Sequence, residues 1–250
     1  MASATKSQPD LGKPDYGIDA PKTVRWLATR GALLALFGVI VFNVNQVSNP
    51  QAAHTIGSMT FFPGLGFLLG AAVMVWSSKF GKLQLRDEML DSISWSGSEK
   101  VLDGGCGRGL MLIGAAKRLS KSGRATGCDI WTSDLSGNTL AAVSMNAKTE
   151  GVADRVKIDT ADLRKLPYAE ASFDVVLSSL AIHNIRGPEG RELAVKELLR
   201  VLKPGGTLLI LDIFQTPNYA KMLEERGASV TVSGLKLLWC LPTRWLRATK

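Results

Sequence analysis

Two long apolar runs dominate the first third of the chain. They extend roughly from Trp26 to Val44 and from Met59 to Trp76, and the polar, turn-prone segment NQVSNPQAAH separates them. Each run is close to the ~20 residues that a helix needs to span a bilayer core. The 48 residues from 31 to 78 contain no Asp, Glu, Lys or Arg, although charged residues make up 21% of the chain. The pattern predicts a transmembrane helical hairpin. The alternative, a pair of buried core helices, would normally keep a charged face.

The charges that flank the hairpin predict its orientation. The connecting segment has no Lys or Arg, whereas basic residues stand at both outer ends: Lys22, Arg25 and Arg30 around the start of the first run, and Lys79, Lys82 and Arg86 after the second. The positive-inside rule then places both termini and the domain that follows in the cytoplasm. A secretory signal peptide fits less well, because the first run begins late and a second run follows it.

The segments around the hairpin complete the division of the chain. Residues 1–22 carry three prolines and little apolar content, which predicts a disordered tail. The residues LQLRDEMLDSI have apolar positions at helical spacing and predict a connecting helix. We therefore expect a tail (1–22), a membrane hairpin (23–80), a connecting helix and turn (81–99), and a domain (100–250).

Strand and helix patterns alternate from Val101 to the end of the chain. Apolar strands are predicted at 101–103, 125–130, 156–158, 173–179 and 207–213, and helices at 111–120, 138–149, 189–202 and 219–226. Such alternation is typical of an α/β fold in which helices cover both faces of a parallel sheet. The final segments ASVTVSG and RWLRATK predict two further strands.

The segment KVLDGGCGRG marks the first strand end. Asp103 is followed by glycines at 105, 107 and 109, so the chain can turn tightly and a ligand can lie against the bare backbone. The helix that follows would direct free N–H groups at that ligand, which favours a nucleotide-like cofactor over a purely structural turn. The dinucleotide fingerprint fails, because Leu110 stands where a third small residue is needed. No phosphate-loop motif of the nucleotide hydrolases occurs either.

Two further strand ends carry suitable residues, and ligands of open parallel sheets bind beyond such ends. Asp129 ends the second strand, where a carboxylate can accept both hydroxyl hydrogens of a ribose. Ile130 and Trp131 could form a wall against adenine, although a lone tryptophan can also serve packing. The third strand leads to Asp162 and Leu163. Each aspartate alone could cap a helix or close a turn, but their joint placement favours a binding site.

Further downstream, LPYAEASFDVV and LKPGG precede the fourth and fifth strands. Together with the strand ends, these motifs resemble the class I S-adenosylmethionine-dependent methyltransferases over residues 85–250. The resemblance implies a Rossmann-like, doubly wound, mostly parallel sheet with an antiparallel last strand. It also implies S-adenosylmethionine as cofactor, with Asp162 at the adenine amino group and the next backbone N–H at a ring nitrogen. The expected cofactor-binding residues are Asp103, Gly104, Gly105, Cys106, Gly107, Gly109, Asp129, Ile130, Trp131, Asp162, Leu163 and Ser178.

Residues after the fourth strand are expected on the methyl side of the cofactor. They include His183, a candidate general base because the imidazole titrates near neutrality. The alternative is a histidine at the pocket rim with no role in proton transfer. The segment TSDLSGN is longer than the usual link in this family and could form a lid over adenine or a surface loop.

Composition limits the acceptor and the partners. The net charge of +8 comes from scattered basic residues, which a position beside anionic lipid explains as well as nucleic acid does. The fourth strand leads into SSLA and not into the [DN]-P-P-[FYW] motif of many amino-group methyltransferases, so no nucleic acid partner is expected. Two histidines and three cysteines show no metal-ligand spacing, so no metal is expected.

The C-terminal stretch LKLLWCLPTRW is conspicuously apolar. It could form an inward-facing hairpin, or a lip toward the bilayer through which a lipid-like acceptor enters. The sequence therefore predicts a membrane-anchored methyltransferase that acts on a small, hydrophobic or lipid-like acceptor such as a quinone precursor. Two alternatives are a non-catalytic membrane-tethered cofactor-binding or assembly protein, and a nicotinamide-dependent oxidoreductase, which Leu110 disfavours.

Overall fold

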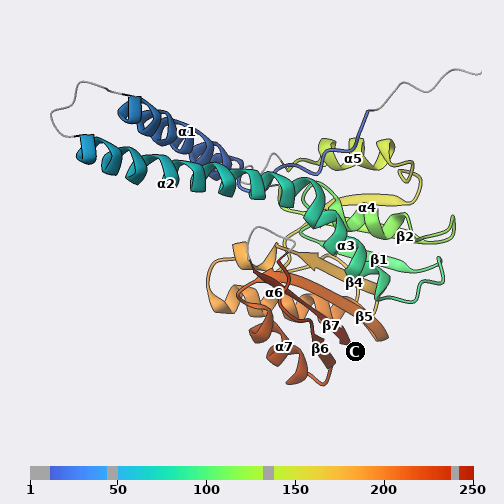
Figure 1. Cartoon of the computed structure of the whole chain (residues 1–250). Helices are drawn as coiled ribbons and strands as arrows, with labels where there is room; N and C mark the ends of the chain where they lie inside the picture. The colour runs from blue at the N-terminus through green and yellow to red at the C-terminus, as the bar shows by residue number, and fades with distance from the viewer. Residues whose placement is uncertain (1–11, 44–49, 132–137, 238–241) are drawn as a thin grey trace, which may run out of the picture.

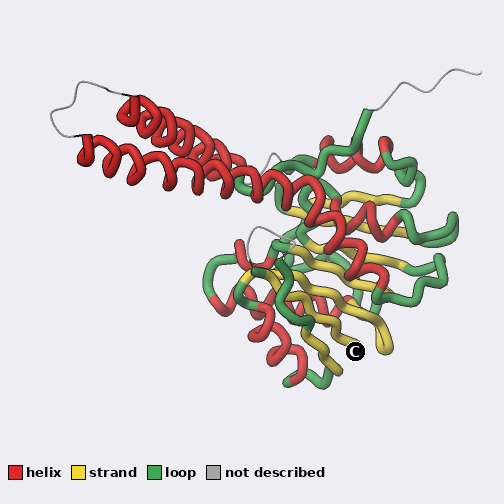
Figure 2. The backbone as a smooth tube through the Cα atoms, in the orientation of Figure 1, coloured by secondary structure: helices red, strands yellow, loops and turns green. Residues whose placement is uncertain are grey.

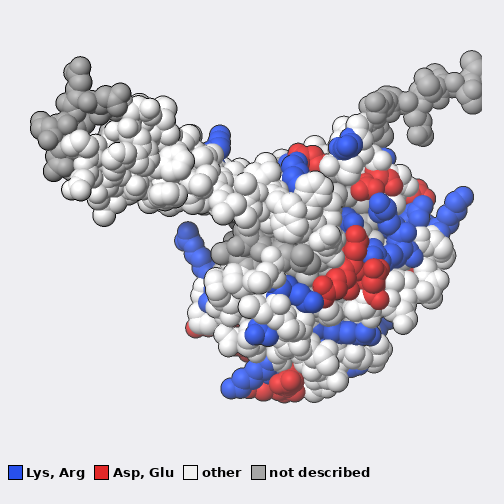
Figure 3. All heavy atoms as spheres, in the orientation of Figure 1, with Lys and Arg blue, Asp and Glu red and all other residues white. Residues whose placement is uncertain are grey.

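The computed structural model describes residues 12–43, 50–131, 138–237 and 242–250. Two long helices, α1 (Pro21–Asn43) and α2 (Pro50–Trp76), lie side by side and project from an α/β domain (Figure 1). Both are long and apolar enough to cross a membrane. In each helix, only 11% of an apolar stretch of 18 residues is buried. The surface of this hairpin is almost free of charged residues, whereas Lys, Arg, Asp and Glu are spread over the domain (Figure 3). The helices are therefore not part of the domain core.

Glycines form the seam between α1 and α2. Gly31 and Gly38 on α1 face Gly64 and Gly57 on α2, and in each helix the two glycines are seven positions apart, which is about two helical turns. A Cβ atom added at Gly64 would lie 2.5 Å from the backbone nitrogen of Ala35. The two backbones therefore approach too closely for any larger residue, as is common for packed helices in membranes.

The second hairpin helix leads into the domain through further helical turns. A π-helical turn, η1 (Ser77–Gly81), follows α2 and passes into α3 (Lys82–Asp91). Three residues of α3, Leu85, Met89 and Leu90, are completely buried in the domain core. Because α3 is part of that core, the hairpin is joined to the domain by a continuous run of helix.

Seven strands form the sheet of the domain in the order β3-β2-β1-β4-β5-β7-β6 (Figure 2). Neighbouring strands are parallel except for β7, which is antiparallel to both β5 and β6. This is the Rossmann-like, mostly parallel sheet with an antiparallel last strand that the sequence predicted. The strands are β1 (Lys100–Gly104), β2 (Arg124–Asp129), β3 (Val156–Thr160), β4 (Phe173–Ser179), β5 (Leu202–Ile213), β6 (Ser229–Val232) and β7 (Thr243–Thr249).

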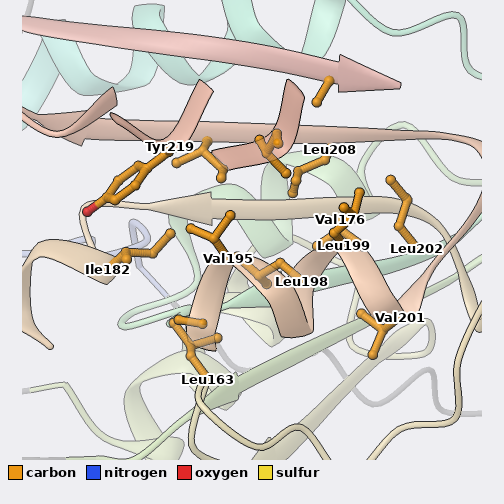
Figure 4. Close-up of a cluster of buried hydrophobic side chains, with 14 of the residues drawn as sticks. Leu163, Val176, Ile182, Val195, Leu198, Leu199, Val201, Leu202, Leu208 and Tyr219 are labelled. Atoms are coloured by element: carbon orange, nitrogen blue, oxygen red, sulfur yellow. The ribbon is translucent and has the colours of Figure 1, made fainter. Parts of the chain in front are cut away.

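Two hydrophobic clusters fill the space between the sheet and its helices. One joins the sheet to α3, α4 (Leu110–Ala116) and α5 (Leu140–Thr149). The other joins it to α6 (Pro188–Val201) and α7 (Thr216–Glu224), with the short 3-10 helix η2 (Ile182–Asn184) at its edge. Figure 4 shows part of this second cluster, including Leu198 and the buried ring of Tyr219. Helices thus cover both faces of the sheet, which leaves the strand ends for ligands.

Three local features differ from the sequence-based expectation. The strand predicted at 207–213 begins earlier, because Leu202 already pairs with Phe173, and the LKPGG segment forms its first part. The helix predicted at 111–120 ends at Ala116. The tail predicted over residues 1–22 is described only from residue 12, and there it makes hydrogen bonds to the domain until α1 begins. These long-range contacts leave no local signal in the sequence.

Candidate functional site

A cavity of about 540 Å³ lies at the carboxyl ends of the central strands. Ends of β1, β2 and β3 and the segment after β4 all contribute to its lining. Most of the predicted site residues meet here, as expected for an open parallel sheet. Those that line the cavity are Asp103, Gly105, Cys106, Gly107, Asp129, Ile130, Asp162, Leu163 and His183.

The glycine turn after β1 forms the base of the cavity. Gly105 and Gly107 have φ values of +74° and +53°, which favour glycine. The backbone N–H groups of Gly105 and Cys106 both donate to the Cys128 carbonyl, at 2.8 and 3.0 Å, so the turn is fixed against β2. A Cβ atom at Gly105 would collide with the side chain of Ala181. The turn therefore needs glycine for both its conformation and its packing.

Asp103 is the most perturbed carboxyl group at the cavity. One oxygen, Oδ2, accepts from the Leu112 backbone N–H at 2.8 Å and so caps α4. The other, Oδ1, is buried and has no hydrogen-bond partner among the described residues. Burial, together with a smaller effect of the nearby charge of Asp129, raises the pKa of this carboxyl to about 7, although the hydrogen bond from Leu112 acts in the opposite direction. A cationic ligand group in the cavity would favour the ionised form of Asp103.

Asp129 supports the glycine turn from the end of β2. Its Oδ2 accepts from the Gly107 N–H at 2.9 Å, and its Oδ1 accepts from the Trp131 N–H at 3.1 Å. Each carboxylate oxygen can accept a second hydrogen bond, so the group can still bind the hydroxyls of a ligand. Ile130 beside it is 52% exposed and lines the cavity.

Asp162 lies at the cavity wall after β3 and is paired with Arg164. The arginine Nε is 3.0 Å from both carboxylate oxygens, and its Nη2 reaches Oδ2 at 2.5 Å. This hydrogen bonding holds the pKa of the Asp162 carboxyl below its usual value. Asp162 is therefore an ionised acceptor, and a ligand at this position would share it with Arg164.

Four predicted residues do not line the cavity and have local contacts instead. The Trp131 indole donates to Thr160 Oγ1 at 2.8 Å, and the Ser178 hydroxyl donates to the Gly104 carbonyl at 3.0 Å, which ties β4 to β1. Gly104 packs against Leu163, and Gly109, with φ +84°, precedes α4 as its N-cap. The predicted insertion TSDLSGN falls outside the described residues except for Asn138, which lines the cavity.

His183 forms a pair with Asp212, a residue that the sequence analysis missed. Its Nδ1 lies 2.5 Å from Asp212 Oδ1, and its backbone N–H donates to Oδ2 at 3.0 Å. Asp212 is completely buried near the end of β5, where Tyr219 also donates to Oδ2 at 3.2 Å. A carboxylate on Nδ1 fixes the ring and leaves Nε2 as the proton acceptor. The only available signal was a charged residue within the apolar strand LLILDI.

The sequence analysis also missed residues that come from the start of the chain. Tyr16, Asp19 and Ala20 line the cavity together with Lys82 of α3. Within the residues that the structure describes, no cluster of three or more His, Cys, Asp or Glu side chains could hold a metal ion.

Comparisons with known proteins agree with this geometry. Residues 102–210 match the family described as a methyltransferase domain. The match lies within the α/β domain. Two solved structures show the same fold: the YcgJ protein from Bacillus subtilis, with a TM-score of 0.53 at 16% identity, and an S-adenosylmethionine-dependent methyltransferase from Aquifex aeolicus, with 0.52 at 18% identity. The similarity covers 68% and 72% of this chain, respectively, and 97% of each of theirs.

Curated relatives are more similar in sequence but only over part of their length. An uncharacterized protein of Haemophilus influenzae is 30% identical over 164 residues, which is 62% of each chain. The methyltransferase GfsG of Streptomyces halstedii is 35% identical over 52% of this chain and 43% of its own. The ubiquinone/menaquinone biosynthesis C-methyltransferase UbiE of Neisseria meningitidis is 34% identical over 46% of this chain and 42% of its own. The chain thus spans less than two thirds of each relative.

Proposed function

We propose that this protein is an S-adenosylmethionine-dependent methyltransferase, anchored in a membrane by its helical hairpin, that methylates a small hydrophobic or lipid-like acceptor. The observation that carries the proposal is the convergence on one cavity of three strand-end aspartates, a glycine turn and His183, which is paired with the buried Asp212. A non-catalytic binding protein would have no need for this pair, and the absence of a third small residue after the glycine turn disfavours a nicotinamide cofactor.

The residues around the cavity fit S-adenosylmethionine. Oδ1 of Asp103, which has no hydrogen-bond partner in the described part of the chain, suits the cationic amino-acid part above the glycine turn. Asp129 retains acceptor capacity for ribose hydroxyls, and Asp162 with the adjacent Leu163 would hold adenine. When bound, this cofactor supplies a methyl group on a sulfonium, which is already a good electrophile.

The work of the protein is then mainly to position the acceptor and to move a proton. His183 contacts Asp212 through Nδ1, so its Nε2 is not engaged in that pair. This Nε2 atom would accept the proton that the acceptor loses at the methylated atom. Asp212 would orient the ring and stabilise its positive charge. The apolar residues Leu180 and Ile185 line the same side of the cavity and would exclude water from the acceptor.

Two observations favour a lipid-like acceptor. The hairpin would hold the domain at a bilayer, which raises its concentration near substrates dissolved in the membrane. UbiE methylates in ubiquinone and menaquinone biosynthesis, so a quinone precursor is the first acceptor to test. We further propose that both hairpin ends and the domain face the cytoplasm, as the flanking basic residues suggest. Added protease should then degrade the domain in inside-out vesicles and spare it in right-side-out vesicles.

The decisive experiment transfers a labelled methyl group from S-adenosylmethionine to a membrane lipid extract and identifies the labelled product. We expect the full-length protein to label a hydrophobic compound, and the His183→Asn variant to label it much more slowly. Tight cofactor binding with no transfer to any extract would favour the binding or assembly protein. Binding of a nicotinamide cofactor in place of S-adenosylmethionine would favour an oxidoreductase.

A further inference from the structure

We propose that residues 15–20 form one wall of the cofactor site and that the buried amine of Lys82 holds this N-terminal strap in place. The inference rests on the proposed function, because it adds ligand-contacting residues to the cavity assigned to S-adenosylmethionine. Three residues of this segment line that cavity: Tyr16, Asp19 and Ala20. They precede Asp103, the first of the strand-end residues, by more than 80 positions in the sequence.

One end of the strap is fixed to the glycine turn and α5. Asp15 and Asn146 exchange two hydrogen bonds of 2.9 Å, between the Asp15 backbone and the Asn146 side chain. Arg108, inside the glycine turn, donates from Nε to the Asp15 carbonyl at 2.8 Å and from Nη2 to the carboxylate at 2.7 Å. Asn146 also donates to the Arg108 carbonyl at 3.0 Å. The same buried amide therefore holds both the strap and the turn beneath the cavity.

The other end of the strap is fixed where the hairpin enters the domain. Lys82 Nζ donates to the carbonyls of Tyr16 and Gly17, each at 2.9 Å, and lies 3.4 Å from the Asp19 carboxylate. Asp19 is also bonded to Ser78, through its backbone N–H at 2.9 Å and its Oδ2 at 3.1 Å. Lys82 is only 2% exposed, and its ammonium donates hydrogen bonds to three residues of the strap. Displacing the strap would leave this charge buried and unpaired, which is costly.

The position of the strap couples the membrane hairpin to the cavity. The strap leads directly into α1 at Pro21, and its anchors lie shortly after α2, Ser78 in η1 and Lys82 at the start of α3. Both hairpin helices thus hold the same wall of the site. Asp19 brings a further carboxylate to a cavity that would receive a cationic ligand, and the ring of Tyr16 brings apolar surface.

The test compares full-length variants in detergent micelles. Lys82→Met removes the ammonium and keeps a long side chain, whereas Lys79→Met removes an exposed lysine one helical turn earlier. We expect the dissociation constant for S-adenosylmethionine, measured by calorimetry, to rise at least about tenfold in the first variant and to stay unchanged in the second. Asp15→Ala removes the exposed carboxylate that Arg108 Nη2 binds and so loosens the other end of the strap. It should raise the dissociation constant about threefold or more even if Lys82→Met folds poorly.

Each outcome bears on a different claim. If the wild-type protein binds S-adenosylmethionine and folded Lys82→Met and Asp15→Ala bind it equally well, the strap is not part of the site and the inference is overturned, while the proposed function stands. If the wild-type protein does not bind the cofactor, the proposed function fails and the inference fails with it.

Discussion

At the residue scale, Asp103 combines two roles that the sequence analysis treated as alternatives. One oxygen caps α4, which is a structural task, and the other is buried beside the cavity without a hydrogen-bond partner among the described residues. Asp129 also has two roles: it accepts a hydrogen bond from the glycine turn, and its oxygens can still accept hydrogen bonds from a ligand. Structural contacts and the proposed cofactor contacts therefore involve the same carboxylates, because both need an acceptor at the end of a strand.

Asp103→Asn should change how stability depends on pH. The native pKa of about 7 lies above the unfolded value of about 3.9, so the native state binds more protons between these values. The unfolding free energy of the wild type should then fall as the pH rises from 4 to 7, roughly the window between the two values. The variant keeps an oxygen for Leu112 and should lose this dependence, as measured by denaturant unfolding. The exposed Asp154→Asn variant should behave like the wild type, and an equal pH slope in Asp103→Asn would contradict the prediction.

Asp129→Ala should weaken binding of S-adenosylmethionine by about 1 to 3 kcal/mol, the scale for the loss of a charged hydrogen-bond partner. The measurement is a calorimetric titration, with Asp154→Ala as an exposed control outside the cavity. Unchanged affinity would remove Asp129 from the site.

Asp212→Asn should lower kcat by about 10² to 10⁴, the usual scale for general base catalysis, without changing the dissociation constant of the cofactor. The amide cannot stabilise a positive charge on His183. Tyr219→Phe removes another hydrogen bond to the same carboxylate and leaves the contact with His183 in place. This variant should lower kcat far less. Equal losses of kcat in both variants would assign Asp212 a purely structural role.

At the scale of elements, the hairpin depends on its glycine seam. Gly64 packs against the backbone of α1, whereas Gly66 on the same helix has open space where a Cβ would be. The two positions differ in their surroundings and share the same residue type and helix. They therefore separate the effect of helix packing from that of composition.

Gly64→Leu should force α1 and α2 apart and lower the thermal unfolding temperature of the full-length protein in micelles. Gly66→Leu adds the same side chain toward open space and should leave the thermal unfolding temperature nearly unchanged. The measurement is thermal unfolding followed by circular dichroism. If Gly66→Leu destabilises the protein as strongly as Gly64→Leu, the close approach of the helices is not what holds the hairpin.

At the scale of the whole molecule, the hairpin and the domain share α3 and the N-terminal strap. The core residues Leu85, Met89 and Leu90 lie beyond the hairpin, so a fragment of residues 81–250 keeps the core helix. The strap, by contrast, precedes α1 and is lost with the hairpin.

The fragment 81–250 should therefore be soluble and folded, and it should bind S-adenosylmethionine more weakly than the full-length protein. Circular dichroism and calorimetry measure these two properties. An insoluble or unfolded fragment would mean that the hairpin belongs to the folding unit of the domain, and full affinity would mean that the strap contributes nothing to binding.

The sequence alone determined the elements, the order of strands and helices, and the glycine turn with its three strand-end aspartates. These features depend on local periodicity and on residues a few positions apart, which a linear pattern records. Only the tertiary structure showed that Asp212 pairs with His183, that Lys82 holds Tyr16 and Asp19 at the cavity, and that Trp131 does not line it. Such contacts join residues far apart in the chain, and packing and side-chain rotamers decide them. A pattern along the sequence determines neither the packing nor the rotamers.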